Sequence, residues 1–258
     1  MIDLHCHILP GVDDGAQSTV ESLSMARKAV EDGIHTIVAT PHTLNGIYFN
    51  PVRKVISMVT DLQDVLLKNN INLRLYAGAD VHLSPLMLEQ IKGGDACTIN
   101  NAKRYILLEF PPQALPPGIN DAIFNLKVNG ITPIITHPER HPVIQHDMDI
   151  LYELVSMGAL CQVTAMSITG DFGGTVRQCS NMLLKHRLIH VIASDAHSSQ
   201  TRPPVLSPAL EATAEIMGSY EDAERMVTEV PASILSGKTL EIPEPRRPKR
   251  GPGFLSRA

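Results

Sequence analysis

The chain has 258 residues, of which 43% are hydrophobic, and its formal net charge at pH 7 is −5. This length allows one large α/β domain or two small ones, with a core that is stable without disulfides. The acidic balance argues against nucleic acid or an anionic membrane as the main partner, because both require a broad basic surface.

Seven short apolar runs rich in β-branched residues alternate with longer segments of helical spacing. They are IDLHCHI at 2–8, HTIVATPH at 35–42, LRLYAGADV at 73–81, YILLEFP at 105–111, TPIITHPER at 132–140, ALCQVTA at 159–165 and HVIASDAH at 190–197. This alternation predicts β–α units and a largely parallel sheet, and seven units predict a barrel.

A helix is expected after each run. The first should be capped by Ser18, with Glu21 completing a capping box. The others are expected at 51–68, from near Ser84, from near Asn120, at 148–157, at 176–186 and after Ser207. We predict one domain over 1–240, followed by a disordered tail at 241–258 that is rich in Pro, Gly and basic residues.

The chain has four cysteines, which are Cys6, Cys97, Cys161 and Cys179. They show neither the CxxC spacing of a structural zinc site nor the pattern of a disulfide framework. A reducing cytoplasm is therefore the expected compartment. The sequence does not open with a basic segment followed by an apolar one, and it has no run of eighteen apolar residues. We expect neither a secreted nor a membrane-spanning protein.

Side chains that can bind metal follow every strand-like run except ALCQVTA. They are His5, His7, Asp13 or Asp14, His42, Asp80, Glu109, His137, Asp195 and His197. Each alone could be a turn residue, a cap or half of an ion pair. Because the C-terminal ends of parallel strands meet at one face, these side chains are expected to lie together.

Burying so many imidazoles and carboxylates at one edge requires cations, because unpaired buried charge costs several kcal/mol. Nine candidate ligands are too many for one ion, so two or three divalent ions are implied. Mn is the expected metal, and Fe, Zn and Co also fit these ligand types. Several divalent ions together favour hydrolysis of a phosphate ester, with Arg140 and Arg202 placed to hold the phosphate or, alternatively, to form ordinary salt bridges.

None of the four cysteines has an arginine six residues further on, as the phosphate loop of a cysteine-dependent phosphatase requires. Cys6 is therefore interpreted as a small buried residue rather than as a nucleophile.

The ordered motifs resemble those of the PHP (polymerase and histidinol phosphatase) superfamily. They are HCH at 5–7, TPH at 40–42, GAD at 78–80, LLEF at 107–110, THPER at 136–140 and SDAH at 194–197. The stretches DLHCHILPGVDDG and VIASDAHSSQTRPP resemble, more narrowly, the bacterial tyrosine phosphatases of capsule and exopolysaccharide synthesis. The resemblance extends from Met1 to about Leu240.

The resemblance implies a distorted seven-stranded barrel with three metal ions and a metal-bound hydroxide as the nucleophile. It implies one ion at His5, His7 and Asp195, a second at Glu109 and His137, and a third at Asp14, His42 and His197. Asp80 would bridge the first two, although the family has the longer Glu there, and the metal spacing or occupancy is expected to change accordingly.

The expected substrate is a phosphotyrosine-bearing protein, namely the tail of a bacterial tyrosine kinase that drives polysaccharide export. Arg140 and Arg202 are assigned to the phosphate by the same resemblance. One alternative is a PHP phosphoesterase for a small molecule such as histidinol phosphate. Another is a PHP domain that binds metal or a partner without catalysis, and a PHP exonuclease is disfavoured by the acidic charge.

Overall fold

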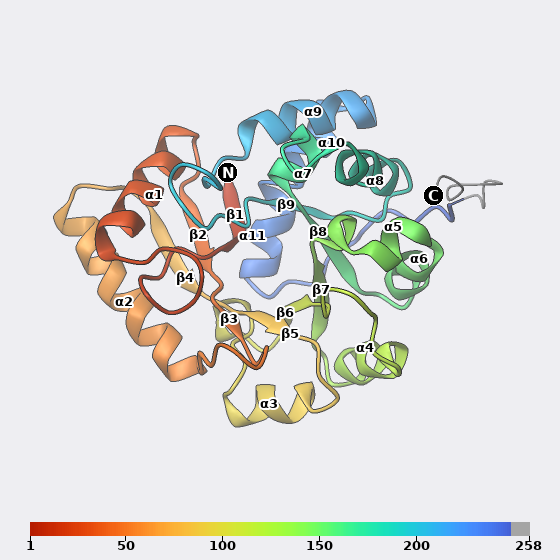
Figure 1. The fold of residues 1–258 in the computed structure, drawn as a ribbon, viewed down its shortest axis with the longest axis horizontal. Helices are drawn as coiled ribbons and strands as arrows, with labels where there is room; N and C mark the ends of the chain where they lie inside the picture. The colour runs from red at the N-terminus through yellow and green to blue at the C-terminus, as the bar shows by residue number, and fades with distance from the viewer. Residues whose placement is uncertain (249–258) are drawn as a thin grey trace.

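The computed structural model describes residues 1–248, and in this part helices surround two β-sheets (Figure 1). Every strand pairing is parallel. The smaller sheet has the order β1-β2-β4, and the larger has the order β3-β5-β6-β7-β8-β9. The strands are β1 (Ile2–Cys6), β2 (Thr36–Ala39), β3 (His42–Thr43), β4 (Arg74–Ala77), β5 (Asp80–His82), β6 (Tyr105–Glu109), β7 (Thr132–Thr136), β8 (Leu160–Thr164) and β9 (Val191–Ala193).

Two of the seven predicted strands are each divided in two, and the division separates the sheets. β2 and β3 flank Pro41, which has no N–H to donate to a neighbouring strand. β4 and β5 flank Gly78, where an added Cβ would lie 2.7 Å from Val38 Cγ1. The two sheets also meet at a bridge between Cys6 and Ala196. The described residues therefore confirm a parallel α/β fold, whereas a single closed seven-stranded barrel stays a prediction.

A second, smaller core shows that the strands enclose side chains as well as packing against helices. Its members come from six of the strands, the turn near Ile99 and the last helix, and they are Ile2, Leu4, Val38, Ile99, Tyr105, Leu107, Ile134, Leu160, Val191 and Ile234. The larger core lies between the strands and the surrounding helices. Layers of apolar side chains on the inward faces of neighbouring parallel strands are typical of barrel-like α/β folds.

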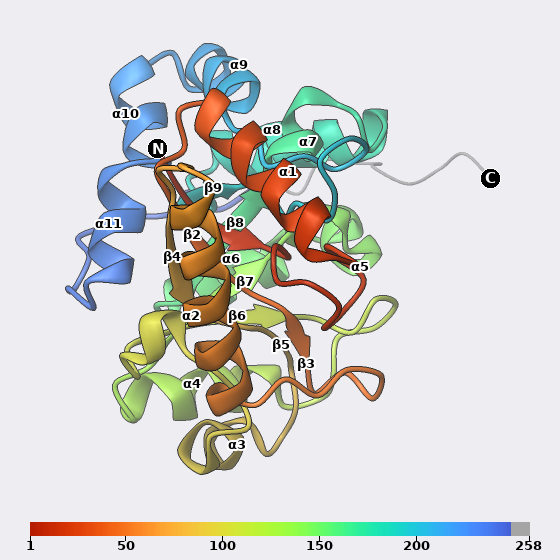
Figure 2. The same cartoon turned by 90° about the vertical axis from the view of Figure 1, so that its left-hand side faces the viewer.

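The helices largely follow the predicted order along the chain. They are α1 (Thr19–Glu31), α2 (Val52–Lys68), α3 (Met87–Gly93), α4 (Ile119–Val128), α5 (Pro142–His146), α6 (Asp149–Ser156), α7 (Ala165–Thr169), α8 (Gly174–Lys185), α9 (Ser207–Met217), α10 (Tyr220–Arg225) and α11 (Glu229–Leu235). In Figure 2, α1 and α2 lie in front of the smaller sheet, and α2 contacts β4. The short helices α5 and α7 were not predicted.

The predicted capping box of α1 is only half present. Ser18 Oγ accepts a hydrogen bond from the N–H of Glu21, as expected. The reciprocal bond is replaced, because the Glu21 carboxylate accepts a hydrogen bond of 2.6 Å from the N–H of Ser199. Glu21 thus connects α1 to the loop that carries Arg202.

The predicted tail lies partly outside the described residues, which end at 248. Residues 241–248 have no helix or strand, yet the N–H of Arg246 donates to His186 O and the guanidinium of Arg247 pairs with Asp149. The predicted disorder of 249–258 concerns residues that the structure does not describe. Among residues 1–248, no helix has both the length and the apolar character needed to cross a membrane.

Candidate metal centre

The predicted metal-binding side chains gather at the C-terminal ends of the strands. They come from β1, β3, β5 and β6 and from the segments that directly follow β7 and β9. Three groups of these side chains place ligand atoms within 4.8 Å of one another. The groups are His5, His7 and Asp80; His7, Asp14, His42 and His197; and His42, Asp80 and Glu109.

His5 lies in β1 and His7 directly follows that strand, and their Nε2 atoms lie 3.1 Å apart. The carboxylate of Asp13 lies 2.7 Å from His7 Nδ1 and accepts a hydrogen bond from it. Burial opposes a charge on His7, but this carboxylate raises the pKa of His7 to about 10. His5 Nδ1 likewise lies 3.0 Å from Gln162 Oε1. A metal ion bound to both Nε2 atoms would displace the proton between them, while the hydrogen bonds at Nδ1 keep the two rings oriented.

Asp195 completes this first cluster. Its Oδ1 lies 3.4 Å from Nε2 of both His5 and His7. Burial alone would raise the pKa of the Asp195 carboxyl, but nearby Arg140 and His5 hold it well below its usual range. Asp195 is therefore an anion that can bind a metal ion.

Asp80 lies in the centre of the site, fully buried, and its Oδ2 has no hydrogen-bond partner within residues 1–248. Nδ1 of His42, which also lacks one there, lies 3.3 Å away. His5 Nε2 is 3.6 Å and His137 Nε2 is 4.0 Å from the same oxygen. Because buried polar atoms are rarely left unpaired, this oxygen is a candidate metal ligand between the clusters.

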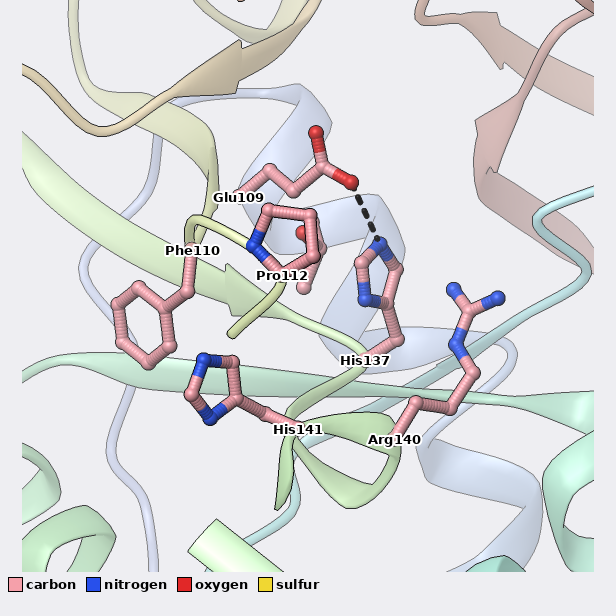
Figure 3. Close-up of a pocket in the computed structure, with 7 residues that line it drawn as sticks. Glu109, Phe110, Pro112, His137, Arg140 and His141 are labelled. Atoms are coloured by element: carbon pink, nitrogen blue, oxygen red, sulfur yellow. Dashed lines mark ion pairs between the residues drawn. The ribbon is translucent and has the colours of Figure 1, made fainter. Parts of the chain in front are cut away.

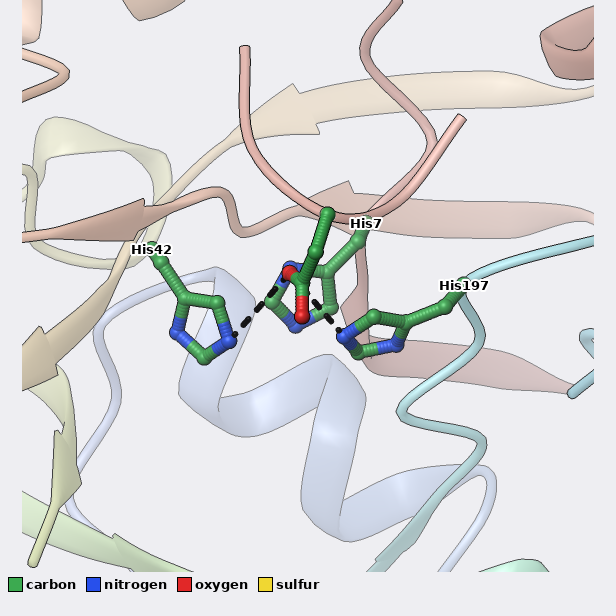
Figure 4. Close-up of side chains that lie close together, drawn as sticks. His7, His42 and His197 are labelled. Carbon is green, nitrogen blue, oxygen red and sulfur yellow. Dashed lines mark ion pairs between the residues drawn. The ribbon is translucent and has the colours of Figure 1, made fainter. Parts of the chain in front are cut away.

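A second group lies closer to solvent. The rings of His7, His42 and His197 face one another (Figure 4), with the His7 and His197 centroids 3.9 Å apart. Asp14 Oδ1 lies 3.6 Å from His42 Nε2 and 3.5 Å from His197 Nε2. Asp14 is half exposed, and its hydrogen bond to His197 is the largest factor that lowers its pKa.

Glu109 and His137 form the third side of the site, with Glu109 Oε1 3.6 Å from His137 Nε2 (Figure 3). Burial and the neighbouring Asp80 carboxylate raise the pKa of Glu109 to about 7. Burial lowers the pKa of His137 well below its usual value, which leaves its imidazole neutral. A neutral imidazole and a crowded carboxylate both gain from a divalent cation.

Backbone conformation supports a functional role for this edge. His137 and Asp195 have positive φ angles, 35° and 50° respectively, in the left-handed region. For non-glycine residues this conformation costs about 1 kcal/mol or more and occurs preferentially at functional sites. Gly15 also has a role in shaping the site, because a Cβ there would lie 2.2 Å from His7 O.

Arg140 and Arg202 converge on Asp195. Nη2 of Arg140 donates to Asp195 Oδ2, and Nη2 of Arg202 donates to the same oxygen at 2.7 Å and to Asp195 O at 3.0 Å. The Nε of each arginine is buried and has no partner within the described part of the chain. The two guanidinium groups therefore keep unused donors beside the metal-binding side chains, which is how an anion site is built.

A cavity of about 200 Å³ opens next to Glu109, His137 and Arg140 (Figure 3). Phe110, Pro112 and His141 line its other side. The orientation of His141 is determined by two hydrogen bonds, since Nε2 lies 2.9 Å from Pro111 O and Nδ1 accepts from the N–H of Val143. The cavity thus has a charged end at the metal-binding groups and an apolar, aromatic end.

One supporting residue was missed from the sequence, and another was left as one of two alternatives. Gln162 orients His5, so the run ALCQVTA contributes a supporting residue although no predicted metal ligand follows it. The signal was a glutamine in the middle of an apolar strand. Asp13, which the sequence could not separate from Asp14, orients His7 through Nδ1, while Asp14 lies with His42 and His197. Cys6 is buried and faces away from this chemistry, as predicted, and burial raises the pKa of its thiol well above the usual value.

The donor set fits divalent metal ions. It combines imidazoles with carboxylates, it includes buried atoms without partners, and two of its histidines, His5 and His7, are oriented by hydrogen bonds at Nδ1. This cluster and the two arginines lie at the C-terminal ends of the strands of a parallel α/β fold. The arrangement is typical of metal-dependent enzymes that act on anionic esters.

Comparisons with known proteins identify the family. Residues 1–236 match the model of the family described as capsular polysaccharide synthesis, CpsB/CapC, and the chain belongs to this family. It is 36% identical over 257 residues to the tyrosine-protein phosphatase YwqE of Bacillus subtilis, which covers 99% of this chain and 100% of the relative. It is 28% identical over 245 residues to the tyrosine-protein phosphatase CpsB of Streptococcus pneumoniae, covering 93% of this chain and 100% of the relative.

A solved structure supports the same family assignment. A chain from the crystal structures of YwqE from Bacillus subtilis and CpsB from Streptococcus pneumoniae, described as unique metal-dependent tyrosine phosphatases, superposes with a TM-score of 0.92. The identity is 37%, and the match covers 97% of this chain and 100% of that chain. The resemblance inferred from the motifs is thereby confirmed at the level of family.

Proposed function

We propose that the protein is a metal-dependent protein-tyrosine phosphatase that hydrolyses the phosphate monoester of phosphotyrosine. The observation that carries the proposal is the cluster of metal-binding side chains and two arginines at one edge, beside an apolar cavity. The relatives named tyrosine-protein phosphatases and the metal-dependent solved relative support it.

Three groups of side chains would hold the metal ions. The first comprises His5, His7 and Asp195, the second Glu109 and His137, and the third Asp14, His42 and His197, with Asp80 between the first two. When bound, divalent ions lower the pKa of a water and offset charge on the phosphoryl oxygens. Mn is our proposed metal.

Arg140 and Arg202 would hold the phosphate. In the structure both guanidinium groups pair with Asp195, and each keeps an unpartnered Nε. If Asp195 binds a metal ion, part of its negative charge is taken up, and the guanidinium groups can turn their donors to phosphate oxygens. The chain supplies these donors at fixed positions, which favours the doubly charged phosphate over neutral esters.

The cavity beside Arg140 would take the tyrosine ring. A cavity of about 150 Å³ is known to hold benzene in another protein, so the volume of about 200 Å³ found here suits one aromatic ring. Phe110 and Pro112 provide apolar contacts, and His141 offers an imidazole face. A leaving group with an aromatic ring would gain from these contacts, whereas an alkyl phosphate would gain less.

The proposed physiological substrate is a phosphotyrosine-bearing protein, namely the tyrosine-rich tail of a bacterial kinase of polysaccharide export. We place the protein in the cytoplasm, where its four unpaired cysteines would stay reduced. The seven-stranded distorted barrel over 1–240, as one domain, is part of the same proposal and is supported by the enclosed second core.

The test compares substrates on the full chain loaded with Mn²⁺. Phosphate release from a phosphotyrosine peptide, a matched phosphoserine peptide and histidinol phosphate is measured with and without a chelator. We expect strong preference for the phosphotyrosine peptide and loss of activity with the chelator. Preference for histidinol phosphate would overturn the proposal that phosphotyrosine is the substrate. Full metal content without hydrolysis of any ester would favour a non-catalytic metal-binding domain.

A further inference from the structure

Phe172 lies against both arginines of the site. Its ring centroid is 5.3 Å from Cζ of Arg140 and 5.7 Å from Cζ of Arg202. Both distances are within the range in which a guanidinium is attracted to the face of an aromatic ring. One ring in contact with two cations therefore joins residues that are far apart in the sequence, on the turn after β7 and on the loop after β9.

The loop that carries Phe172 connects α7 to α8 and has a glycine with a positive φ angle on each side of the ring. Gly170 and Gly173 have φ angles of +100° and +94°, which residues with a Cβ rarely adopt. Phe172 itself is partly exposed and belongs to neither hydrophobic core. The two guanidinium groups are thus charged neighbours of this ring. Packing of the hydrophobic cores does not explain an aromatic residue at this position.

The ring can stabilise the two arginines side by side. They carry like charges and share one carboxylate oxygen, Asp195 Oδ2, although the carboxylates of Glu139 and Asp80 also attract Arg140. The negative face of an aromatic ring offsets part of the remaining repulsion without occupying a hydrogen-bond donor. It also restricts the rotamers of two long side chains, which lowers the entropy lost when an anion binds.

We propose that Phe172 is a positioning residue that holds Arg140 and Arg202 side by side, so that a single phosphate group receives hydrogen bonds from both. The inference rests on the proposed function for the phosphate but concerns the binding of the anion alone. Phe172 acts through the arginines, so its contribution does not depend on the group esterified to the phosphate.

The test compares three single variants of the full chain loaded with Mn²⁺, and it repeats Phe172→Leu in an Arg202→Ala background. Phe172→Leu removes the ring and keeps an apolar side chain, and Phe172→Tyr keeps the ring. Phe124→Leu, on an exposed phenylalanine of α4, is the matched control. The readouts are the dissociation constant of inorganic phosphate by calorimetry, kcat and KM for a phosphotyrosine peptide and for an alkyl phosphate, metal content, and thermal unfolding.

We expect Phe172→Leu to weaken phosphate binding about fivefold to tenfold, since each cation–π contact is modest and two are lost. kcat/KM should fall by a similar factor for both esters, with metal content unchanged. Phe172→Tyr and Phe124→Leu should stay within twofold of the wild type. The effect of Phe172→Leu should also shrink when Arg202 is already replaced by alanine, because the two residues act as a unit.

Several results would overturn the inference. Unchanged phosphate binding in Phe172→Leu would do so, as would equal losses in the Leu and Tyr variants. A loss confined to the phosphotyrosine peptide would assign the ring to the substrate instead of the arginines. If the wild type binds phosphate but hydrolyses no phosphotyrosine, the proposed function fails. The dissociation constants of phosphate for the wild type and the variants then still decide the role of Phe172. Absence of phosphate binding by the wild type overturns both.

Discussion

Replacement of Asp13 should weaken metal binding at His7, although Asp13 lies behind the metal-binding atoms. Its Oδ2 accepts hydrogen bonds from His7 Nδ1 at 2.7 Å and from the N–H of His42 at 3.0 Å. Its Oδ1 accepts from the N–H of Gly15 at 3.0 Å. Asp13 thus holds one metal-binding ring, the start of β3 and the loop over β1 in place.

The expected magnitude follows from these three bonds. Asp13→Asn keeps the shape but removes the charge that favours the correct tautomer of His7, and we expect metal affinity to fall about 10- to 100-fold, or roughly 1.4 to 2.7 kcal/mol. Asp13→Ala leaves three buried donors without a partner, at about 1 kcal/mol or more each. The metal-free protein should then lose roughly 3 kcal/mol of stability.

The assay is competition for Mn²⁺ against a chromophoric chelator, together with urea unfolding of the metal-free protein. Asp61→Asn, on the exposed face of α2, is the control and should match the wild type. If Asp13→Asn binds metal with wild-type affinity, the orientation of His7 by Asp13 is not what shapes the site, and the reasoning fails.

Three further predictions concern single residues. Gly15→Ala would place a Cβ 2.2 Å from His7 O and should lower both the stability and the metal content of the protein. Gly174→Ala is the control, because open space surrounds Gly174. Equal behaviour of the two variants in urea unfolding and metal analysis would contradict this prediction. Asp80→Glu should change metal occupancy or turnover, and no change in either would mean that the shorter side chain is tolerated. Burial lowers the pKa of His190 to about 4, so its stabilising contribution is present above pH 6.5 and is lost as the pH falls toward 4. Relative to His190→Asn, the wild type should lose roughly 2 to 3 kcal/mol between pH 7.5 and 4.5, and a constant difference in urea unfolding would refute the assignment.

The alternation of apolar runs and helical segments was sufficient to predict a parallel α/β fold, because residues with β-branched side chains mark the buried strands locally. It did not show that the runs at 35–42 and 73–81 would each be divided. That outcome depends on how Pro41 and Gly78 pack between neighbouring strands, where Gly78 approaches Val38. The short helices α5 and α7 were missed for a related reason, since five residues are too few for a periodic pattern.

The gathering of the candidate metal ligands at one edge could be predicted because each lies near the end of an apolar run, and the ends of these runs are visible in the sequence. Their partners could not, because hydrogen bonds across the fold leave no local pattern. Gln162 and His5 are 157 positions apart, and Glu21 contacts Ser199 across 178 positions. The ring of Phe172 was likewise overlooked, since nothing near it in the sequence indicates two arginines from other loops.

Phosphate release from a phosphotyrosine peptide, measured against the number of Mn²⁺ ions bound per chain, tests the central claim most directly. The protein is first stripped with a chelator and then titrated with Mn²⁺, and bound metal and initial rate are recorded at each step. We predict no hydrolysis by the stripped protein, a rate that rises with bound metal, and loss of that rate when the chelator is added again. Hydrolysis that is independent of bound metal, or a metal-loaded protein that releases no phosphate from the peptide, would contradict the account.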